Sequence, residues 1–422
     1  MTPVPSPPAD PSAANSPYRW IIFALMALGS MTYMFMWMAP ASLLTTIRAD
    51  LGVGLGQAGM LLTIIPLVNG IFIFFGSLFV DKLGLKWASV LALTLMAVGG
   101  MTAIIASGFA VLLASRILIG IGAGLFSPTT GPLTVAWFPA REQPYVNTLI
   151  TIMGSLGTSL AFVVTVPLLD AAGSWRLVLG LVALVPLALA LGWVIGGRQA
   201  PAALAPHPQI TVEEEFRHME SGIVQAIKRR EILLLAVAVV GQVWVFNTLT
   251  TYLPSYFETV HGLDKIAAGS ITGILPIAGI AGGLLCGTAC GMSGRRRPFL
   301  WPLMFAMLVS ALVVALLPPG PLVYLAIAVF GFASTGCSVP ILTTSMDLPG
   351  TNPQLVGGAI AVIYGLAFIL SFFASPLFGL VAPLVGMRTA LVVFSLPLVV
   401  SVAALYRIPE TGPGPARAAV LG

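Results

Sequence analysis

One arginine inside an apolar stretch is the residue of this 422-residue chain best placed to do chemistry. Arg116 begins the sequence RILIGIGAG, and no acidic residue lies at the centre of any apolar stretch. A charge in such surroundings is costly unless it pairs, meets water or reaches a polar surface. Arg116 could therefore face a cavity, where it would bind an anionic group or gate the coupling of protons to a solute. It could also be structural, binding carbonyl groups or extending to the surface.

A second set of candidates consists of aromatic and amide side chains within apolar stretches. They are Tyr33 and Trp37 in the first stretch, Trp244 and Asn247 in its later counterpart, and the buried polar candidates Asn69, Asn147 and Tyr364. Tyr33 and Trp37 are four residues apart, which places them on one face of a helix. Each of these side chains could contact a bound solute. Each could equally be a packing or lipid-facing residue.

Metal, cofactor and enzyme chemistry are poorly supported. Met34 and Met38, and likewise Cys286 and Cys290, are four residues apart, and thioethers and thiols favour Cu(I). Methionine is nevertheless common in apolar helices, and cysteine is often a small buried residue. The sequence has no phosphate-binding loop, zinc-ligand cluster or nucleophile elbow. We therefore expect no cofactor, no metal site and no hydrolytic activity, with copper transport as a minor alternative.

The composition indicates that lipid surrounds most of the chain. Of its residues 58% are hydrophobic and 8% are charged, whereas a soluble domain has roughly 25% charged residues. Apolar runs predict twelve spanning helices, each about 20 residues or longer. The first six are expected near 20–47, 57–80, 88–106, 110–136, 145–169 and 176–197. The second six are expected near 232–257, 266–289, 299–317, 321–345, 355–382 and 389–406.

The distribution of basic residues predicts the orientation. Most of the 19 Lys and Arg residues fall on the side that holds both termini, whereas only Arg48, Arg176, Lys265 and Arg388 fall on the opposite side. Basic loops face the cytoplasm, so both termini are predicted there, with the chain in a bacterial-type inner membrane. Anionic lipid headgroups, rather than nucleic acid, are the expected partner of these charges.

The predicted organisation is two six-helix bundles with polar connections. We expect a disordered tail over 1–18, a bundle over 19–197, a central cytoplasmic loop over 198–231, a second bundle over 232–407 and a tail over 408–422. Residues 59–66 read GMLLTIIP and residues 269–276 read GSITGILP, an offset that also carries Gly84 onto Gly294. Similar offsets pair Pro40 with Pro254 and Pro128 with Pro340. Such pseudo-symmetric halves are typical of transporters that bind solute between them.

The loop after the second span resembles a known family signature. Residues 77–86, SLFVDKLGLK, are similar to the sequence GxLADRxGRK of the major facilitator superfamily, with matches at Asp81, Lys82, Gly84 and Lys86. Gly84 would allow a tight cytoplasmic turn between the two spans. Residues 287–297 form a degenerate second copy, with Gly291 in place of the acid. Arg116 to Gly124 resembles the RxxxGxG motif of the family, and its glycines Gly120, Gly122 and Gly124 permit close helix packing or backbone approach. The resemblance covers essentially the whole chain and is nearest in style to bacterial cyanate- and nitrate-type permeases, although the arginines of nitrate carriers in spans two and eight are missing here.

The resemblance implies an all-α membrane protein with the major facilitator fold. It further implies a monomeric secondary transporter that moves a small, anionic solute by alternating access, coupled to protons or another gradient. Asp81, Lys82, Gly84 and Lys86 would then be gating residues, with Asp81 held by the helix start after Thr351, Asn352 and Pro353. An efflux antiporter for drugs or metabolites is the main alternative, weakened by the lack of a carboxylate within a span. A membrane sensor that binds without flux is a third.

Overall fold

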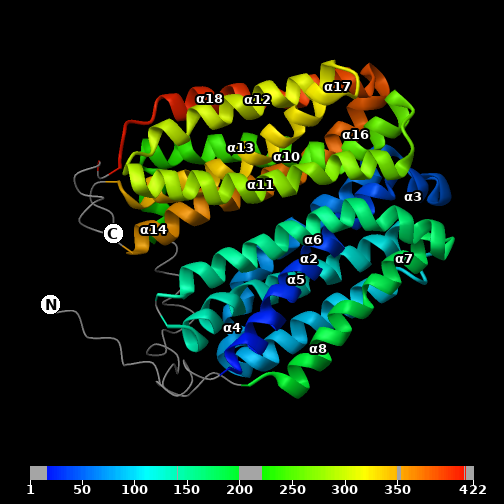
Figure 1. Cartoon of the computed structure of the whole chain (residues 1–422), viewed down its shortest axis with the longest axis horizontal. Helices are drawn as coiled ribbons and strands as arrows, with labels where there is room; N and C mark the ends of the chain where they lie inside the picture. The colour runs from blue at the N-terminus through cyan, green and yellow to red at the C-terminus, as the bar shows by residue number, and fades with distance from the viewer. Residues whose placement is uncertain (1–16, 140, 199–220, 349–352, 413, 415–422) are drawn as a thin grey trace. The chain divides into compact units, whose positions relative to one another are not determined.

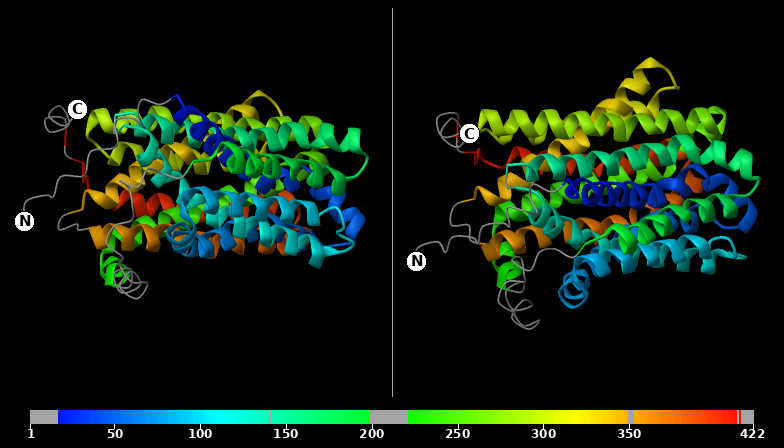
Figure 2. Two further views of the ribbon diagram at one scale, coloured as in Figure 1. Left: turned by 90° about the horizontal axis from the view of Figure 1, so that it is seen from below. Right: turned by 60° about the horizontal axis from the view of Figure 1, so that its bottom comes forward.

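The computed structural model describes residues 17–139, 141–198, 221–348, 353–412 and 414, and over these ranges every regular element is a helix (Figure 1). The further views in Figure 2 show the same all-helical composition. Twelve helices in the described ranges are long and apolar enough to cross a membrane. The predicted all-α fold with twelve spans is therefore confirmed.

The helices of the first half of the chain include several that are interrupted or bent. They are α2 (Arg19–Ser42), α3 (Leu44–Leu51), α4 (Leu55–Thr102), α5 (Phe109–Trp137), α6 (Gln143–Ala172), α7 (Trp175–Val182) and α8 (Leu184–Gly196). The second half begins with α10 (Arg230–His261), α11 (Lys265–Ser293), the short η2 (Arg297–Phe299), α12 (Trp301–Leu316) and α13 (Pro321–Met346). It continues with α14 (Pro353–Ile360), the π-helical turn η3 (Ala361–Gly365), α15 (Leu366–Phe372), α16 (Ala374–Val385), α17 (Met387–Ser395) and α18 (Pro397–Tyr406).

Gly84 interrupts the long helix α4. Its φ of 74° and ψ of 164° lie in a region that only glycine enters readily. The interruption separates two candidate spans, Leu55–Ile73 and Lys82–Thr102. The predicted tight turn at Gly84 is therefore confirmed.

By packing, the chain divides into two compact units. Unit 1 contains the described residues of Met1–Trp37, Ile64–Thr158 and Ala171–Gln209, and unit 2 contains those of Met38–Thr63, Ser159–Asp170 and Ile210–Gly422. Unit 2 thus includes two segments from the first half of the sequence, 38–63 and 159–170. These units follow packing rather than sequence symmetry, so the predicted bundles 19–197 and 232–407 stay a prediction.

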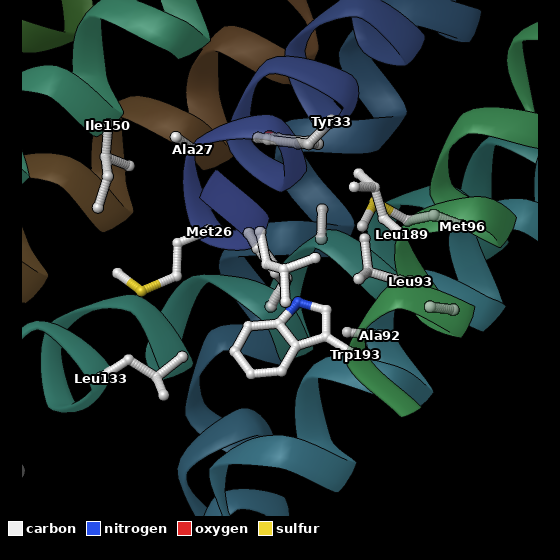
Figure 3. Close-up of a cluster of buried hydrophobic side chains, with 14 of the residues drawn as sticks. Met26, Ala27, Tyr33, Ala92, Leu93, Met96, Leu133, Ile150, Leu189 and Trp193 are labelled. Carbon is white, nitrogen blue, oxygen red and sulfur yellow. The ribbon is translucent and has the colours of Figure 1, made fainter. Parts of the chain in front are cut away.

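The core of unit 1 is a cluster of buried apolar side chains around Trp193, which has no exposed surface. Figure 3 shows Trp193 among side chains that include Met26, Leu93 and Leu133, contributed by four different helices. In unit 2, α11 and α13 pack through glycines. A Cβ on Gly331 would lie 2.0 Å from the Leu275 carbonyl oxygen, and one on Gly282 would lie 2.0 Å from that of Phe332. Glycine at these positions permits the close approach.

Candidate functional site

Arg116 is buried inside unit 1, on α5. Its side chain is 1% exposed, and its Nη1 donates a hydrogen bond of 3.0 Å to the carbonyl oxygen of Met36 in α2. Among the described residues its Nε has no hydrogen-bond partner, and no carboxylate lies within ion-pair distance. The carbonyl contact is the kind that a structural role requires. The unpaired Nε is the kind of group that a ligand could satisfy, so the functional role stays a prediction.

The glycines that follow Arg116 bring α5 against α4. A Cβ on Gly120 would lie 2.9 Å from Val68 Cβ, and one on Gly122 would lie 2.6 Å from the Ala92 carbonyl oxygen. At Gly124 an added Cβ would lie 2.6 Å from Phe72 Cβ. The close backbone approach predicted for this motif is confirmed, and it fixes the helix that carries the arginine.

Three of the sequence-predicted binding residues meet within unit 1. The rings of Tyr33 and Trp37 stack with centroids 6.0 Å apart and planes 19° apart. Asn69 Nδ2 donates a hydrogen bond of 3.0 Å to the Tyr33 hydroxyl. The amide oxygen of Asn69 is buried and has no partner among the described residues. These side chains form a small polar group with one unused acceptor, which suits the recognition of a ligand donor.

Asn147 does not join this group. It was expected to be buried, and that expectation was wrong, because Asn147 is exposed while its neighbours Val146 and Ile150 are buried. Asn147 lies at the margin of the packed face that Val146 and Ile150 define on α6, so it stays in reach of α5 while most of its surface is exposed. Its amide oxygen accepts a hydrogen bond of 3.2 Å from Thr134. A role in binding stays a prediction.

The candidates of unit 2 lie on α10 and in the π-helical turn η3. Asn247 is buried and its Nδ2 donates a hydrogen bond of 3.2 Å to Ser371 Oγ. Trp244 stacks on Phe394 at 5.8 Å, and its Nε1 has no hydrogen-bond partner in the described part of the chain. Tyr364 is half-buried within the π-helical turn η3. Such turns occur frequently at functional sites, and no local sequence pattern predicts this one.

The predicted gating residues are only partly described. Lys86 Nζ donates a hydrogen bond of 2.9 Å to the carbonyl oxygen of Val194 in α8 and lies 5.5 Å from the Trp87 ring centre. Lys82 is exposed. The Asp81 side chain and residues Thr351 and Asn352 lie outside the described positions. The proposed attraction between Asp81 and that helix start therefore stays a prediction.

The degenerate second copy of the loop signature is in contact with a carboxylate, that of Glu410, which follows α18. Glu410 accepts backbone hydrogen bonds from Arg296 at 2.8 Å, Gly412 at 2.9 Å and Arg297 at 3.2 Å. Partial burial raises the pKa of Glu410, but these backbone donors outweigh it and hold the pKa below its ordinary value. Arg296 in turn pairs with Asp347 at 2.8 Å. Glu410 thus supplies an acid to the loop in which Gly291 replaces the family's acid.

A group of contacts that no sequence pattern predicts lies within unit 2, at the end predicted to be periplasmic. The buried Tyr252 hydroxyl lies 2.6 Å from the Ser375 carbonyl oxygen and 3.1 Å from that of Leu55. Thr45 Oγ1 donates to the Glu258 carboxylate at 2.9 Å, and Lys265 Nζ donates to Thr46 Oγ1 at 2.8 Å. We call these contacts the Tyr252 clamp. It fastens the segment 38–63, from the first half of the sequence, to α10, α11 and α16.

Comparison with known proteins identifies the class. Residues 26–370 match the sequence profile of the Major Facilitator Superfamily, so this chain belongs to that family of membrane transporters. It is similar to a hexuronate transporter of Bacillus subtilis, with 26% identity over 239 residues that span 56% of each protein. It is also similar to a purine ribonucleoside efflux pump of Salmonella typhimurium, with 25% identity over 342 residues, 78% of this chain and 71% of that protein.

A solved structure with the same fold is that of a bacterial homologue of the human lysosomal transporter Spinster. The TM-score is 0.77 at 13% identity, and the alignment covers 93% of this chain and 97% of that one. At this identity the likeness concerns the fold alone. The family and its relatives are transporters rather than enzymes, and together they support a secondary transporter that moves a small molecule across a lipid membrane.

Proposed function

We propose that this chain is a secondary active transporter that carries a small anionic solute by alternating access, driven by a proton or other ion gradient. The supporting observation is the Arg116 guanidinium, which is 1% exposed and has an unpaired Nε. No carboxylate among the described residues balances its charge. A positive charge held inside a membrane helix without a protein counter-ion favours an anion as its ligand.

The chemistry of arginine suits such a ligand. Its planar group presents donors in a fixed fork that matches a carboxylate or a similar oxyanion with two parallel hydrogen bonds. In the described structure Nη1 donates to the Met36 carbonyl, while Nε is buried and has no partner. The similarity to a hexuronate transporter supports the same class of solute, because a hexuronate is an anion.

The test is a ligand screen by thermal unfolding of the purified protein in detergent. Small carboxylates and inorganic anions should raise the melting temperature of the wild type, because a ligand that binds only the folded state stabilises it. Arg116→Ala should weaken that binding by about 1.5–3 kcal/mol, which is about one to two decades in affinity. Arg116→Lys should bind weakly, since a point charge replaces the fork.

Arg176→Ala provides the matched control. Arg176 also donates to a carbonyl in unit 1, from its Nε to the Ala106 oxygen at 2.7 Å, but it is half-buried and lies at the predicted membrane surface. Its replacement should leave the anion response unchanged. If Arg116→Ala folds normally and binds the stabilising anion with wild-type affinity, Arg116 is structural and the anion proposal fails.

Efflux of a neutral metabolite is the second candidate function, and the similarity to a purine ribonucleoside efflux pump favours it. The same screen distinguishes the two, because purine ribonucleosides would then stabilise the protein and Arg116→Ala would not abolish the response. A sensor would bind its ligand but show no counterflow in liposomes. Copper transport would require Cys286 and Cys290, whose replacement is considered below.

We also propose that both termini face the cytoplasm across a bacterial-type inner membrane. The supporting observation is the sequence position of the basic residues, which concentrate in the segments on the side of the termini. Alkaline phosphatase fused after Tyr406 should then be inactive in cells, whereas a fusion in the connection between α10 and α11 should be active. The reverse pattern would invert the proposed orientation.

A further inference from the structure

Pro40 leaves one carbonyl of helix α2 without its helical partner. In an α-helix the N–H of each residue bonds to the carbonyl four positions earlier, and proline has no N–H. Pro40 lies inside α2, and the residue four positions earlier is Met36. The carbonyl that receives the Arg116 Nη1 hydrogen bond is therefore the one that Pro40 leaves free. The guanidinium replaces the donor that proline lacks.

This contact lies within unit 1, next to the position at which the chain of α2 leaves that unit. Unit 1 ends at Trp37 on α2, and unit 2 begins at Met38. Helix α4 makes the same passage between Thr63 and Ile64, and it contains Pro66. In both helices the boundary between the two units thus lies within four residues before a proline. Helices bend most readily at such positions, because one backbone hydrogen bond is already missing. Of the two, only the α2 passage has a freed carbonyl that bonds to Arg116.

We propose that the Met36 carbonyl and the transported anion compete for the Arg116 guanidinium. When the anion binds, the carbonyl loses its donor and α2 becomes free to bend at Pro40. This rests on the proposed function, because it assigns the anion to Arg116. A carboxylate carries a full charge and is a stronger acceptor than a neutral carbonyl. The Met36 carbonyl occupies Nη1, so an anion that takes both terminal nitrogens of the guanidinium replaces the carbonyl there. Because the arginine is 1% exposed, the packing around it must change for the anion to reach it. Binding and bending are thereby linked through one side chain.

The first test needs no ligand. Pro40→Ala restores the N–H that bonds to Met36, so Arg116 is no longer the main donor to that carbonyl. Arg116→Ala should therefore lower the melting temperature of the wild type more than it lowers that of the Pro40→Ala protein. Pro254→Ala, at the counterpart position in α10, is the control and should leave the effect of Arg116→Ala unchanged. Equal effects of Arg116→Ala in all three backgrounds would overturn the link between Pro40 and Arg116.

The second test uses the anion that gives the largest thermal shift with the wild type. Pro40→Ala should bind this anion about 2- to 10-fold more tightly, the effect of removing one competing hydrogen bond. Its counterflow in liposomes should be slower, because α2 bends less readily. In the wild type the same anion should accelerate hydrogen exchange of the amides over 36–44, a measurement that requires no variant.

The outcomes separate this inference from the proposed function. If the anion binds in an Arg116-dependent way, but Pro40→Ala leaves affinity unchanged or the anion leaves exchange over 36–44 unchanged, the competition is refuted while the anion function stands. If no anion binds the wild type, the proposed function and the competition both fail. The ligand-free comparison of melting temperatures then still decides whether Arg116 replaces the donor that Pro40 lacks.

Discussion

Replacing Tyr252 by phenylalanine should loosen the hold of α10 on the segment 38–63 without disturbing the core. The ring stacks on Phe378 with centroids 4.5 Å apart, and phenylalanine keeps that contact. Only the hydroxyl is lost, which lies 2.6 Å from the Ser375 oxygen and 3.1 Å from the Leu55 oxygen. The substitution therefore isolates one polar group of the Tyr252 clamp.

The magnitude follows from the hydrogen bonds that one hydroxyl can donate. A net hydrogen bond contributes about 0.5–1.5 kcal/mol, and the single proton of Tyr252 is shared between two carbonyls. The contact with Leu55 is the longer of the two, so its loss should lie at the low end, about 0.5 kcal/mol. The opening equilibrium of the segment 38–63 should then increase about twofold. If Tyr252 gives its full hydrogen bond to Leu55, the increase should be at most about tenfold.

Hydrogen exchange followed by mass spectrometry measures this opening directly. Amides over 55–63 should lose protection about 2- to 10-fold in Tyr252→Phe. Tyr256→Phe is the matched control, because Tyr256 is equally buried on the same helix but donates at 2.9 Å to Ala315 in α12. It should leave 55–63 unchanged. Unaltered protection over 55–63 in Tyr252→Phe, or an equal loss in Tyr256→Phe, would refute the clamp.

Three further predictions concern the gate, the thiols and the turn in α4. Asp81→Asn should shift the population toward the cytoplasmically open state, because the carboxylate no longer attracts the helix start near Pro353. Double electron–electron resonance between the cytoplasmic ends of the two halves measures this shift, and an unchanged distance distribution would exclude the attraction. Cys286→Ser combined with Cys290→Ser should leave transport intact, and loss of copper uptake at normal protein level would instead support metal transport. Gly84→Ala should lower stability by roughly 1–3 kcal/mol, because a side chain is strained at a φ of 74°; a wild-type melting temperature would contradict this strain.

Local sequence patterns predicted those features that depend on one helix or one turn. Twelve apolar runs predicted the spans, and the loop glycine predicted the tight turn at Gly84. The four-residue spacing of Tyr33 and Trp37 predicted their shared face, and the rings do stack. The glycines after Arg116 predicted the close approach of α5 to another helix. Such features follow from the helical period and from the conformational freedom of glycine.

Features that depend on long-range pairing were not predictable in this way. The Tyr252 hydroxyl and the Leu55 carbonyl are 197 residues apart in sequence, and any carbonyl can accept a hydrogen bond. The burial of Asn147 was predicted wrongly, because the apolar run of α6 identified a spanning helix but not which face packs. Pro40 predicts that the Met36 carbonyl lacks its helical donor, because a proline inside a helix removes one backbone hydrogen bond. Which side chain satisfies that carbonyl depends on the packing of α2 against α5.

Counterflow in proteoliposomes tests the central claim most directly. Vesicles loaded with the anion that stabilises the wild type should accumulate the same labelled anion from outside, in a saturable way, with no added energy source. Arg116→Ala vesicles with equal amounts of folded protein should need about 10- to 100-fold more anion for the same accumulation, whereas Arg176→Ala vesicles should match the wild type. Counterflow that persists in Arg116→Ala at the wild-type rate, or counterflow confined to neutral or cationic solutes, would contradict an anion carrier that depends on Arg116.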